Sequence, residues 1–295
     1  SVNNTLYGHP VKTFGTHEQK LEFLKPVAGG EVEGCYALTE AGAGSDAAAL
    51  RCKAELKGDK YIVNGTKVFI TNGPVARYCV LAATTDLSLG YKGVINLIVD
   101  LKETPGFKVG KIEEKLGILA SGTSELVFED AEVPAANLLG KPGQGFQQMM
   151  AGLNAGRIGI GAQACGIGRA CLEDALNYSK ERVQFGKPIA SNQIIQFKLA
   201  DMATQLDASE LLLLRAAWME DQGMDFEMES AMSKYYSSDV AMNAAIECVQ
   251  IFGGYGYVKE YPAERHMRDA KICQIYEGTN EIQRVVVARK LLGHR

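Results

Sequence analysis

The pattern of apolar and polar positions changes character twice along the chain. From Thr5 to Lys25 the apolar residues follow a helical spacing. Thr16 and Gln19 have the spacing of a capping box, and Pro26 is expected to end this helical segment. The chain therefore begins with a short helical region.

From about Gly34 to Leu139 the pattern is typical of short strands. Turn signals at Lys57-Gly58-Asp59, Asn64-Gly65 and Pro105-Gly106 separate β-branched and aromatic runs. Because the strands follow each other closely without intervening helices, they predict an antiparallel sheet or barrel rather than a parallel βαβ sheet. The expected strands are Cys35 to Thr39, Tyr61 to Val63, Lys67 to Thr71, Tyr78 to Ala83, Val94 to Asp100 and Glu125 to Phe128.

From Gly145 onwards helical periodicity dominates. The first segment is rich in alanine and glycine, which allow helices to approach closely, and Gly253-Gly254 is expected to end the third. Long helices joined by short connections predict an antiparallel bundle. The expected helices are Phe146 to Leu172, Ile194 to Leu214, Ala231 to Phe252 and Asn280 to Leu292.

Composition narrows the class of protein. The chain has 295 residues and a net charge of −4, which argues against a nucleic-acid-binding protein. It contains no apolar run long enough to cross a bilayer and no basic-then-apolar signal sequence at its start. The 7 cysteines are scattered without a CxxC pair, and the 4 histidines lack metal-ligand spacing. These features predict a soluble, mildly acidic intracellular protein with reduced thiols and no metal, and they favour an enzyme.

Gly42-Ala43-Gly44-Ser45-Asp46-Ala47 fits the G-x-G-x-x-G/A pattern after an expected strand. A Rossmann interpretation fails on context, because hairpin signals follow where a helix and a parallel strand are required. Two interpretations stay open. The segment is a tight glycine turn, or its backbone N–H groups, with the hydroxyls of Thr39 and Ser45, hold the polar edge of a flat cofactor.

Several blocks occur in a fixed order and are more specific together than any one of them alone. Their series closely resembles the acyl-CoA dehydrogenase family of flavoproteins over essentially the whole chain, and within it the short-chain, butyryl-type branch. The blocks are Tyr36 to Asp46, Phe69 to Gly73, Phe128 to Asp130 with Asn137 to Gly140, Arg182 to Gly186, Gln250 to Tyr257, Arg268 to Lys271 and Ile275 to Gln283.

The resemblance implies an α+β fold with an N-terminal helical domain, a middle antiparallel, barrel-like β domain and a C-terminal four-helix bundle. Residues 1–30 are then the remnant of an N-terminal domain that is mostly missing, 31–142 the middle domain and 143–295 the bundle. The family binds FAD between the last two domains and oxidises acyl-CoA thioesters to 2,3-enoyl-CoA. Its members pass electrons to an electron-transferring flavoprotein.

The resemblance also implies cofactor contacts, some of which the family makes across subunits of a homotetramer. Phe69 stands where the family usually has Trp, so a flat aromatic is retained while the indole N–H is lost. The Arg182 guanidinium suits the FAD diphosphate. The implied FAD-binding residues are Tyr36, Leu38, Thr39, Gly44, Ser45, Phe69, Ile70, Thr71, Arg182, Gln184, Phe185, Gln193, Gln250, Gly253, Gly254, Thr279 and Glu281.

Glu277 lies in the block that matches the family's catalytic segment and is the implied base. Gly156 occupies a position where some members instead place their catalytic Glu. This chain departs from the family at three positions: Asn154 stands where the family commonly has Asp, Leu119 where it has Arg, and Ala41 where it has Pro. The implied acyl-CoA-binding residues are Ser45, Asn154, Arg157, Tyr276 and Gly278.

Three functions are compatible with these observations. The first is an FAD-dependent acyl-CoA dehydrogenase acting on a short or medium chain, in a bacterial cytoplasm or a mitochondrial matrix. A catalytically silent scaffold or assembly protein of the same family is the second, although neither Glu277 nor the segment from Thr39 to Ser45 is damaged. An acyl-CoA oxidase that passes electrons to oxygen is the third.

Overall fold

The computed structural model describes residues 2–293, which form two compact units that we treat separately. Unit 1 contains the residues up to Lys115 together with Leu119–Gly156. Unit 2 contains Leu116–Ile118 and the residues from Arg157 onwards. The domain boundaries expected at residues 30 and 142 stay predictions.

Unit 1 begins with a helical path that Gly15 interrupts. The expected capping box is present, since Gln19 N–H donates to Thr16 Oγ1 and Thr16 N–H donates to Gln19 Oε1. The expectation that Pro26 ends the helix is wrong. A wider π-helical turn, closed by Lys25 N–H on Lys20 O, precedes it, and in the first turn of α3 the missing N–H of proline is tolerated. The segments are Asn3–Gly8 (π), α1 His9–Phe14, α2 His17–Gln19, Lys20–Leu24 (π) and α3 Lys25–Ala28.

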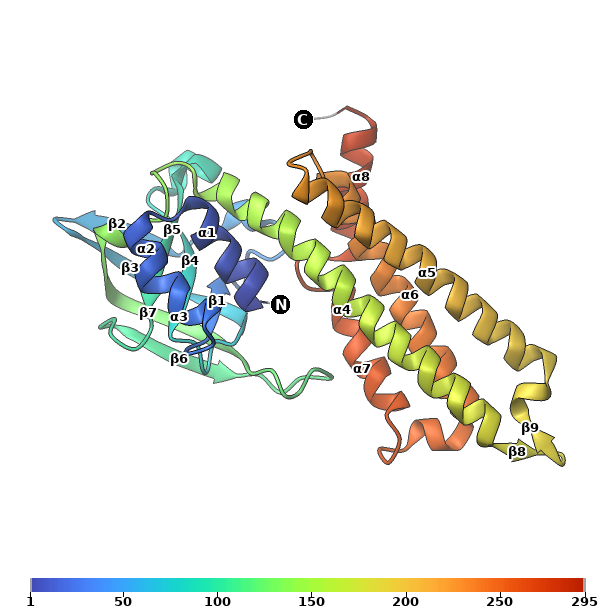
Figure 1. The fold of residues 1–295 in the computed structure, drawn as a ribbon. Helices are drawn as coiled ribbons and strands as arrows, with labels where there is room; N and C mark the ends of the chain where they lie inside the picture. Colours follow the sequence, from blue (N-terminus) through green and yellow to red (C-terminus); the bar gives the residue numbers. More distant parts are fainter. Residues whose placement is uncertain (1, 294–295) are drawn as a thin grey trace. The chain divides into compact units, whose positions relative to one another are not determined.

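The sheet of unit 1 has the strand order β1-β4-β2-β3-β7-β6, with β5 paired to β4. In Figure 1 the helices α1 to α3 lie over one side of this sheet. The strands are β1 Gly34–Ala37, β2 Lys53–Lys57, β3 Lys60–Thr71, β4 Tyr78–Thr84, β5 Val94–Asp100, β6 Phe107–Ile112 and β7 Thr123–Pro134, with 3-10 turns at Ala47–Ala49, Leu87–Gly93 and Ala135–Asn137.

The α+β fold class is confirmed, but the antiparallel expectation is incomplete. The β2–β3, β3–β7, β4–β5 and β6–β7 pairs are antiparallel, whereas β1 and β2 both run parallel to β4. Asn64-Gly65 is not a turn, because it lies at a bulge inside the continuous strand β3. Local sequence cannot separate these cases, because bulges and turns share the same residue preferences.

Both faces of the sheet are covered, which explains why β4 is apolar without alternation. Cys79, Leu81 and Ala83 belong to one buried cluster, and the intervening Val80 and Ala82 belong to another. The second cluster includes residues of α1 and α3, so the N-terminal helices cover that face. A strand buried on both sides reads as a continuous apolar run.

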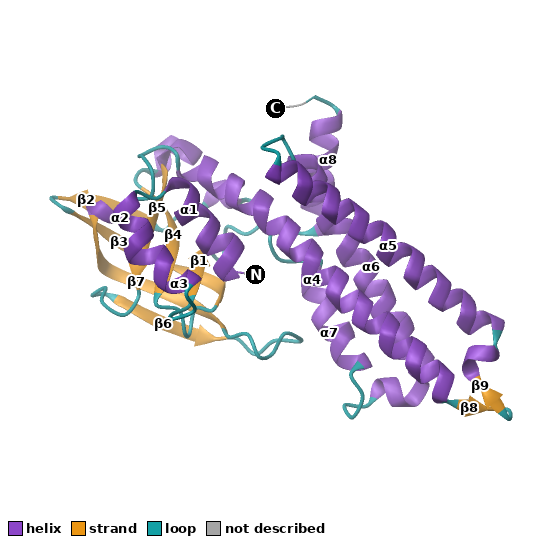
Figure 2. Cartoon of the chain, in the orientation of Figure 1, coloured by secondary structure: helices purple, strands orange, loops and turns teal. Residues whose placement is uncertain are grey.

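Unit 2 is helical, and the four long helices expected there are confirmed (Figure 2). The sequence did not predict α7 or the small hairpin β8–β9. The elements are α4 Gly145–Glu181, which begins in unit 1, β8 Val183–Gln184, β9 Lys187–Pro188, Ile189–Ser191 (3-10), α5 Gln193–Asp221, α6 Glu227–Phe252, Gly253–Tyr257 (3-10), α7 Ala263–Cys273 and α8 Asn280–Leu291. Among the described residues no helix is long and apolar enough to span a membrane.

Small residues let α4 lie close to its neighbours in unit 2. A Cβ added at Gly168 would lie 2.5 Å from Leu206 Cδ2 on α5 and 3.4 Å from the Ala241 Cα on α6. A larger residue there would push the helices apart, at a typical cost of about 1–3 kcal/mol for overpacking. The glycine-rich composition of α4 therefore fixes the close packing of the bundle.

Candidate active site

In unit 1 the segment that follows β1 is held by a completely buried lysine. The Lys67 ammonium on β3 is 0% exposed. It donates to Leu38 O at 2.8 Å and to Glu40 Oε1 at 2.7 Å. Val68 N–H donates to Thr39 O at 2.9 Å. The first residues of the turn from Leu38 to Ser45 are thus hydrogen-bonded to β3.

Glu40 completes this arrangement. Its two carboxylate oxygens accept the N–H groups of Arg51, at 2.7 Å, and Cys52, at 2.9 Å. Burial by itself raises the pKa of Glu40, but the Lys67 ammonium and these hydrogen bonds outweigh burial and lower it. The carboxylate is therefore ionised and acts as a fixed anchor.

The turn presents part of the predicted cofactor set at the surface of unit 1. Gly44 and Ser45 are exposed, and a Cβ added at Gly44 would meet nothing within 4 Å. Leu38 and Thr39 are half-buried. Tyr36 instead belongs to the core, and its buried hydroxyl has no hydrogen-bond partner among the described residues.

Phe69 lies at an irregular point of β3. The register against β7 shifts between Lys67 and Ile70, and Phe69 between them has a left-handed backbone with φ 59°. Its ring is 65% exposed, whereas Ile70 is buried and Thr71 is half-buried. A bulky residue in this conformation is strained, and such strain is concentrated at functional sites.

In unit 2 a cavity of about 590 Å³ brings together four of the predicted cofactor residues. Arg182, Gln184, Gly253 and Gly254 line it. The Arg182 guanidinium lies 5.3 Å from the centre of the Tyr255 ring, which also lines the cavity. Gly253 ends α6 with φ 62°, a conformation that favours glycine.

The five other predicted cofactor residues of unit 2 do not line this cavity, and three of them are exposed to solvent on the helices α5 and α6 or in the β8–β9 hairpin. Phe185 is 100% exposed with φ 51°, between β8 and β9. Gln193 begins α5 and Gln250 lies in the last turn of α6, and both are exposed. These residues face solvent in the single chain.

Glu277 lies on a strained turn between α7 and α8. Its φ is 53°, and that of Gly278 is 90°. Thr279 caps α8 by accepting the Ile282 N–H, and Glu281 is exposed in the first helical turn. The Glu277 N–H makes no hydrogen bond to any residue that the structure describes. The turn therefore offers one carboxyl group and one available N–H donor.

The Glu277 carboxyl group is set up to exchange a proton near neutral pH. Its Oε2 is buried and has no hydrogen-bond partner within residues 2–293. Burial raises the pKa of Glu277 to about 7, against the opposing charges of Lys234 and Arg157. A carboxyl group with such a pKa suits general-base catalysis.

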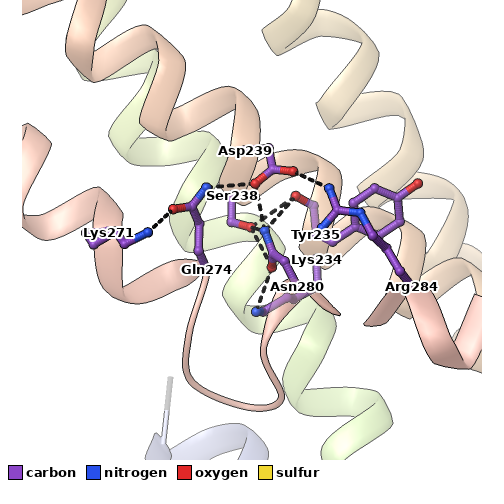
Figure 3. Close-up of polar contacts among 8 residues, drawn as sticks. All are labelled: Lys234, Tyr235, Ser238, Asp239, Lys271, Gln274, Asn280 and Arg284. Atoms are coloured by element: carbon purple, nitrogen blue, oxygen red, sulfur yellow. Dashed lines mark hydrogen bonds and ion pairs between the residues drawn. The ribbon is translucent and has the colours of Figure 1, made fainter. Parts of the chain in front are cut away.

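A polar network lies beneath this turn (Figure 3). Lys234 on α6 is 0% exposed and donates to Gly278 O at 2.8 Å and to Asn280 Oδ1 at 3.0 Å. Asn280 Nδ2 donates to Ser238 Oγ at 2.9 Å and to Asp239 Oδ1 at 2.8 Å. Gln274 and Arg284 also donate to Asp239.

The predicted substrate residues are spread over several elements. Arg157 on α4 is 5% exposed, and burial lowers its pKa while Glu227 and Glu277 raise it. Tyr276 OH donates to Gln163 Oε1 at 2.7 Å, and burial raises the Tyr276 pKa. Asn154 is half-buried on α4, in unit 1, and Gly156 on the same helix is buried.

The sequence reasoning assigned no role to the two buried lysines, Lys67 and Lys234. A signal for Lys234 was available, because it lies on the same helical stripe as the buried Ala231, Ser238 and Ala241. Lys67 likewise begins a largely apolar run. A charged residue within a buried pattern is seldom found unless it is paired or bonded. Among the described residues no cluster of His, Cys, Asp and Glu could hold a metal ion.

Two family models match this chain. Residues 35–131 match the acyl-CoA dehydrogenase middle domain, and residues 143–292 match the acyl-CoA dehydrogenase C-terminal domain. The chain is 52% identical to an acyl-CoA dehydrogenase of Bacillus subtilis over 99% of this chain and 77% of that protein.

Solved structures agree with the family models. Butyryl-CoA dehydrogenase from Megasphaera elsdenii matches with a TM-score of 0.96 and 50% identity, over 98% of this chain and 75% of that one. A chain in a structure of the electron-transferring flavoprotein of Acidaminococcus fermentans matches with a TM-score of 0.95 and 52% identity, over 97% and 75%. The chain therefore belongs to the acyl-CoA dehydrogenase family of oxidoreductases.

Proposed function

We propose that this protein uses FAD to oxidise a short- or medium-chain acyl-CoA thioester to the trans-2-enoyl-CoA, with an electron-transferring flavoprotein as acceptor. The observation that carries the proposal is Glu277, whose Oε2 is buried without a hydrogen-bond partner among the described residues and whose pKa of about 7 makes it a suitable base. Similarity to the butyryl-CoA dehydrogenase of Megasphaera elsdenii supports the chain length. Similarity to a chain in the Acidaminococcus fermentans flavoprotein structure supports the acceptor.

The donor chemistry of both units fits FAD. In unit 1, the exposed Phe69 ring offers a flat apolar surface, and the open segment at Gly44 and Ser45 leaves N–H and hydroxyl groups accessible. In unit 2, Arg182 supplies a guanidinium suited to a diphosphate, beside two glycines that leave room for a ligand. We assign FAD binding to Tyr36, Leu38, Thr39, Gly44, Ser45, Phe69, Ile70, Thr71, Arg182, Gln184, Phe185, Gln193, Gln250, Gly253, Gly254, Thr279 and Glu281.

When bound, FAD would accept the hydride equivalent from the β carbon of the thioester. The chain's own part is proton transfer. Glu277 takes the α proton through its carboxylate, so that the two hydrogens leave as one proton and one hydride. The Glu277 N–H, which makes no hydrogen bond within residues 2–293, would stabilise negative charge on the thioester oxygen, and such a donor contributes about 3–4 kcal/mol.

The acyl-CoA thioester would contact Ser45, Asn154, Arg157, Tyr276 and Gly278. Gly278, next to the base, has a φ of 90°, and a Cβ there would lie 2.6 Å from Gln283 Nε2, so this turn requires glycine. Arg157 is a buried cation, and its charge would favour an anionic or strongly polarised ligand. Asn154 stands where the family commonly has Asp, so it offers an amide instead of a carboxylate.

We further propose that the protein assembles as a homotetramer. Large apolar side chains near both ends of α5 are exposed in the single chain, and exposed apolar surface of this kind marks an interface. Sedimentation of the flavin-loaded protein should give a tetramer, and a flavin-loaded monomer at micromolar concentration would overturn this assignment. The exposed α5 residues are Ile194, Phe197, Leu211, Leu214 and Trp218.

The function is tested by reduction of bound flavin under anaerobic conditions. Purified protein loaded with FAD is mixed with saturated acyl-CoA thioesters of graded length, and the flavin absorbance is followed. Bleaching is expected with butyryl-CoA or a somewhat longer thioester. Absence of bleaching with every thioester would contradict the proposed activity and favour the scaffold interpretation.

The base is tested with Glu277→Gln, which should retain FAD and thioester binding. Its rate of flavin reduction should fall by about 10²–10⁴-fold or more, because general-base catalysis is lost. Glu210→Gln on α5 is the matched control, because it removes only a surface ion pair with Arg169 on α4. In this variant the acyl-CoA thioester should reduce the flavin at the wild-type rate. Near wild-type bleaching by Glu277→Gln would place the base elsewhere.

The acceptor is tested by reoxidation of the reduced protein. A dehydrogenase should be reoxidised rapidly by an electron-transferring flavoprotein and only slowly by air. Rapid reoxidation by oxygen alone would favour an acyl-CoA oxidase.

The Arg182 assignment is tested by FAD affinity. Arg182→Ala should weaken FAD binding roughly tenfold to a hundredfold, because a hydrogen bond to a charged group contributes about 1.5–3 kcal/mol. Arg169→Ala on α4, whose guanidinium forms a surface ion pair with Glu210, is the control. Equal flavin retention by both variants after dialysis would argue against the assignment.

A further inference from the structure

A fully buried lysine without a carboxylate partner lies directly beneath the Glu277 turn. Lys234 is 0% exposed, and among the described residues it forms no ion pair. Its ammonium donates instead to two neutral oxygens, Gly278 O and Asn280 Oδ1. An ammonium held in this way is costly to bury, so its retention calls for a function.

The acceptors of Lys234 belong to the turn that carries Glu277. Gly278 O also accepts from Gln283 Nε2 at 3.0 Å, and Glu277 O accepts from the same nitrogen at 3.2 Å. Glu277 and Gly278 are both left-handed, and a non-glycine residue in that region costs of the order of 1–3 kcal/mol. Lys234 and Gln283 together therefore hold a turn that would otherwise relax.

Asp239 lies on the same helix as Lys234 but forms no ion pair with it. Asp239, five residues further along α6, accepts hydrogen bonds from Asn280, Gln274 and Arg284 (Figure 3). Asn280 therefore lies between the lysine and the aspartate, with its oxygen towards one and its nitrogen towards the other. The positive charge of Lys234 is thus left to act on Glu277.

We propose that Lys234 is a positioning residue for Glu277, which holds the strained turn through Gly278 O and supplies the positive charge that allows the buried carboxyl group to ionise. The inference rests on the proposed role of Glu277 as base. In this arrangement Asn280 bridges Lys234 and Asp239 by hydrogen bonds, so the two charged groups do not form an ion pair with each other. Lys234 does not touch the substrate and acts only through the turn and its charge.

Several other titratable or charged groups face Lys234 and Glu277. Arg157 faces them from α4, Asp239 from α6 and Cys273 from α7. Burial raises the pKa of Cys273 to about 11. Among the described residues that face this pair, Glu277 and Lys234 are therefore the groups expected to change charge between about pH 6 and 9.

The test compares Lys234→Met with wild-type protein in rapid-mixing flavin reduction across pH. We expect the limiting rate at neutral pH to fall by about 10- to 100-fold, because the base is misplaced. The midpoint of the rise in rate with pH should move upward by about one unit, since an opposite charge near the carboxylate is lost. Lys234→Gln, which keeps a donor but no charge, should show the same shift in midpoint with a smaller loss of rate.

Lys198→Met is the matched control, because Lys198 on α5 forms an ion pair with Glu247 away from the turn. It should keep the wild-type rate and midpoint. If Lys234→Met or Lys234→Gln loses only yield or thermal stability, while the rate per bound flavin and the midpoint are unchanged, the lysine is merely structural and the proposal is wrong.

A measurement on wild-type protein needs neither a variant nor activity. The pKa of Lys234 is lowered to about 8 by burial, so the charge that holds Gly278 O is lost as pH rises through that value. Asn280 N–H closes the turn on Gln274 O at 3.0 Å. A local opening of the turn breaks the bond to Gly278 O but leaves Lys234 buried on α6, unlike global unfolding, which exposes the lysine. The hydrogen-exchange protection of Asn280, corrected for the intrinsic rate, should therefore fall roughly threefold to tenfold between pH 7 and 9.

Unchanged protection over that interval would overturn the proposal even if both lysine variants fail to fold. The outcomes also separate the two levels of inference. Wild-type protein that bleaches with no thioester contradicts the proposed function, whereas the exchange measurement still reports whether Lys234 holds the turn.

Discussion

Each unit contains one fully buried lysine beneath a turn of the candidate site, and the two differ in their partners. Lys67 donates to Leu38 O at 2.8 Å, and Lys234 donates to Gly278 O at the same distance of 2.8 Å. Their second acceptor is the carboxylate of Glu40 for Lys67 and the amide oxygen of Asn280 for Lys234. Both lysines therefore donate to a backbone carbonyl. The charge of Lys67 is balanced by a carboxylate, whereas Lys234 has no ion-pair partner among the described residues.

Lys67 and Lys234 show two different roles of a buried charge. Beneath the turn from Leu38 to Ser45 the Lys67–Glu40 pair has no net charge, and Glu40 also accepts hydrogen bonds from the N–H groups of Arg51 and Cys52. Such a pair holds backbone in place without influencing distant groups. Beneath the Glu277 turn Lys234 forms no ion pair among the described residues, so its charge acts on the carboxyl group whose ionisation the proposed chemistry requires.

The largest effect is expected from breaking the paired lysine. Lys67→Met should lower the free energy of unfolding by about 3–5 kcal/mol, because it leaves Glu40 buried without its partner. The double variant Lys67→Met with Glu40→Gln should recover part of the loss. Denaturant unfolding measures both, and a loss below about 1 kcal/mol would show that the pair does not anchor the turn.

The unpaired lysine should reveal itself in the pH dependence of stability. The pKa of Lys234 is lowered by burial from 10.5 to about 8, so between these values the unfolded chain binds more protons than the folded one. Folding stability therefore rises with pH across that interval, by at most about 3 kcal/mol. The difference in unfolding free energy between wild type and Lys234→Met, measured at both ends, isolates this contribution. A pH-independent difference would contradict it.

Glu277 should show the opposite sign. Burial raises its pKa from 4.5 to about 7, so the folded chain holds its proton where the unfolded chain has lost it. The contribution of the protonated Glu277 to folding stability is fully present below pH 4.5, and it is lost as the pH rises to about 7. Glu277→Gln should therefore be more stable than wild type by about 1–3 kcal/mol at pH 8, with the gain vanishing near pH 4. Equal stability of the two proteins at pH 8 would mean that the carboxyl group is solvated.

The smallest expected effect is the difference in stability between alanine substitutions of Gly278 and Gly44, one in each turn. A Cβ at Gly278 would lie 2.6 Å from Gln283 Nε2, and φ there is 90°, so Gly278→Ala should cost about 1–2 kcal/mol. Gly44→Ala is the matched change in the other turn, where the added Cβ meets nothing within 4 Å. It should change stability by less than about 0.5 kcal/mol. Similar losses in thermal unfolding for both would show that the two turns are equally constrained.

Local sequence determined much of this protein. The Thr16–Gln19 capping box and the four long helices needed only short-range patterns, because helical periodicity and capping bonds link residues a few positions apart. The apolar run of β4 likewise gave a strand. The ordered blocks carried the resemblance to the family that the comparisons then showed.

Tertiary structure alone decided the features that depend on distant segments. The parallel pairing of β1 with β4 follows from β2 and β3 lying between them in the chain, and the pattern of β1 by itself does not choose a partner. Asn64-Gly65 became a bulge because β7 pairs along the whole of β3.

The two buried lysines give the clearest case. Lys67 and Lys234 meet their backbone acceptors 29 and 44 residues away, and whether the second acceptor is a carboxylate or an amide depends on which segment the fold brings near. Residue type specified the two charges. Only the packing of the chain decided which charge is neutralised and which acts on Glu277, because burial and electrostatic interaction are properties of the surroundings in space.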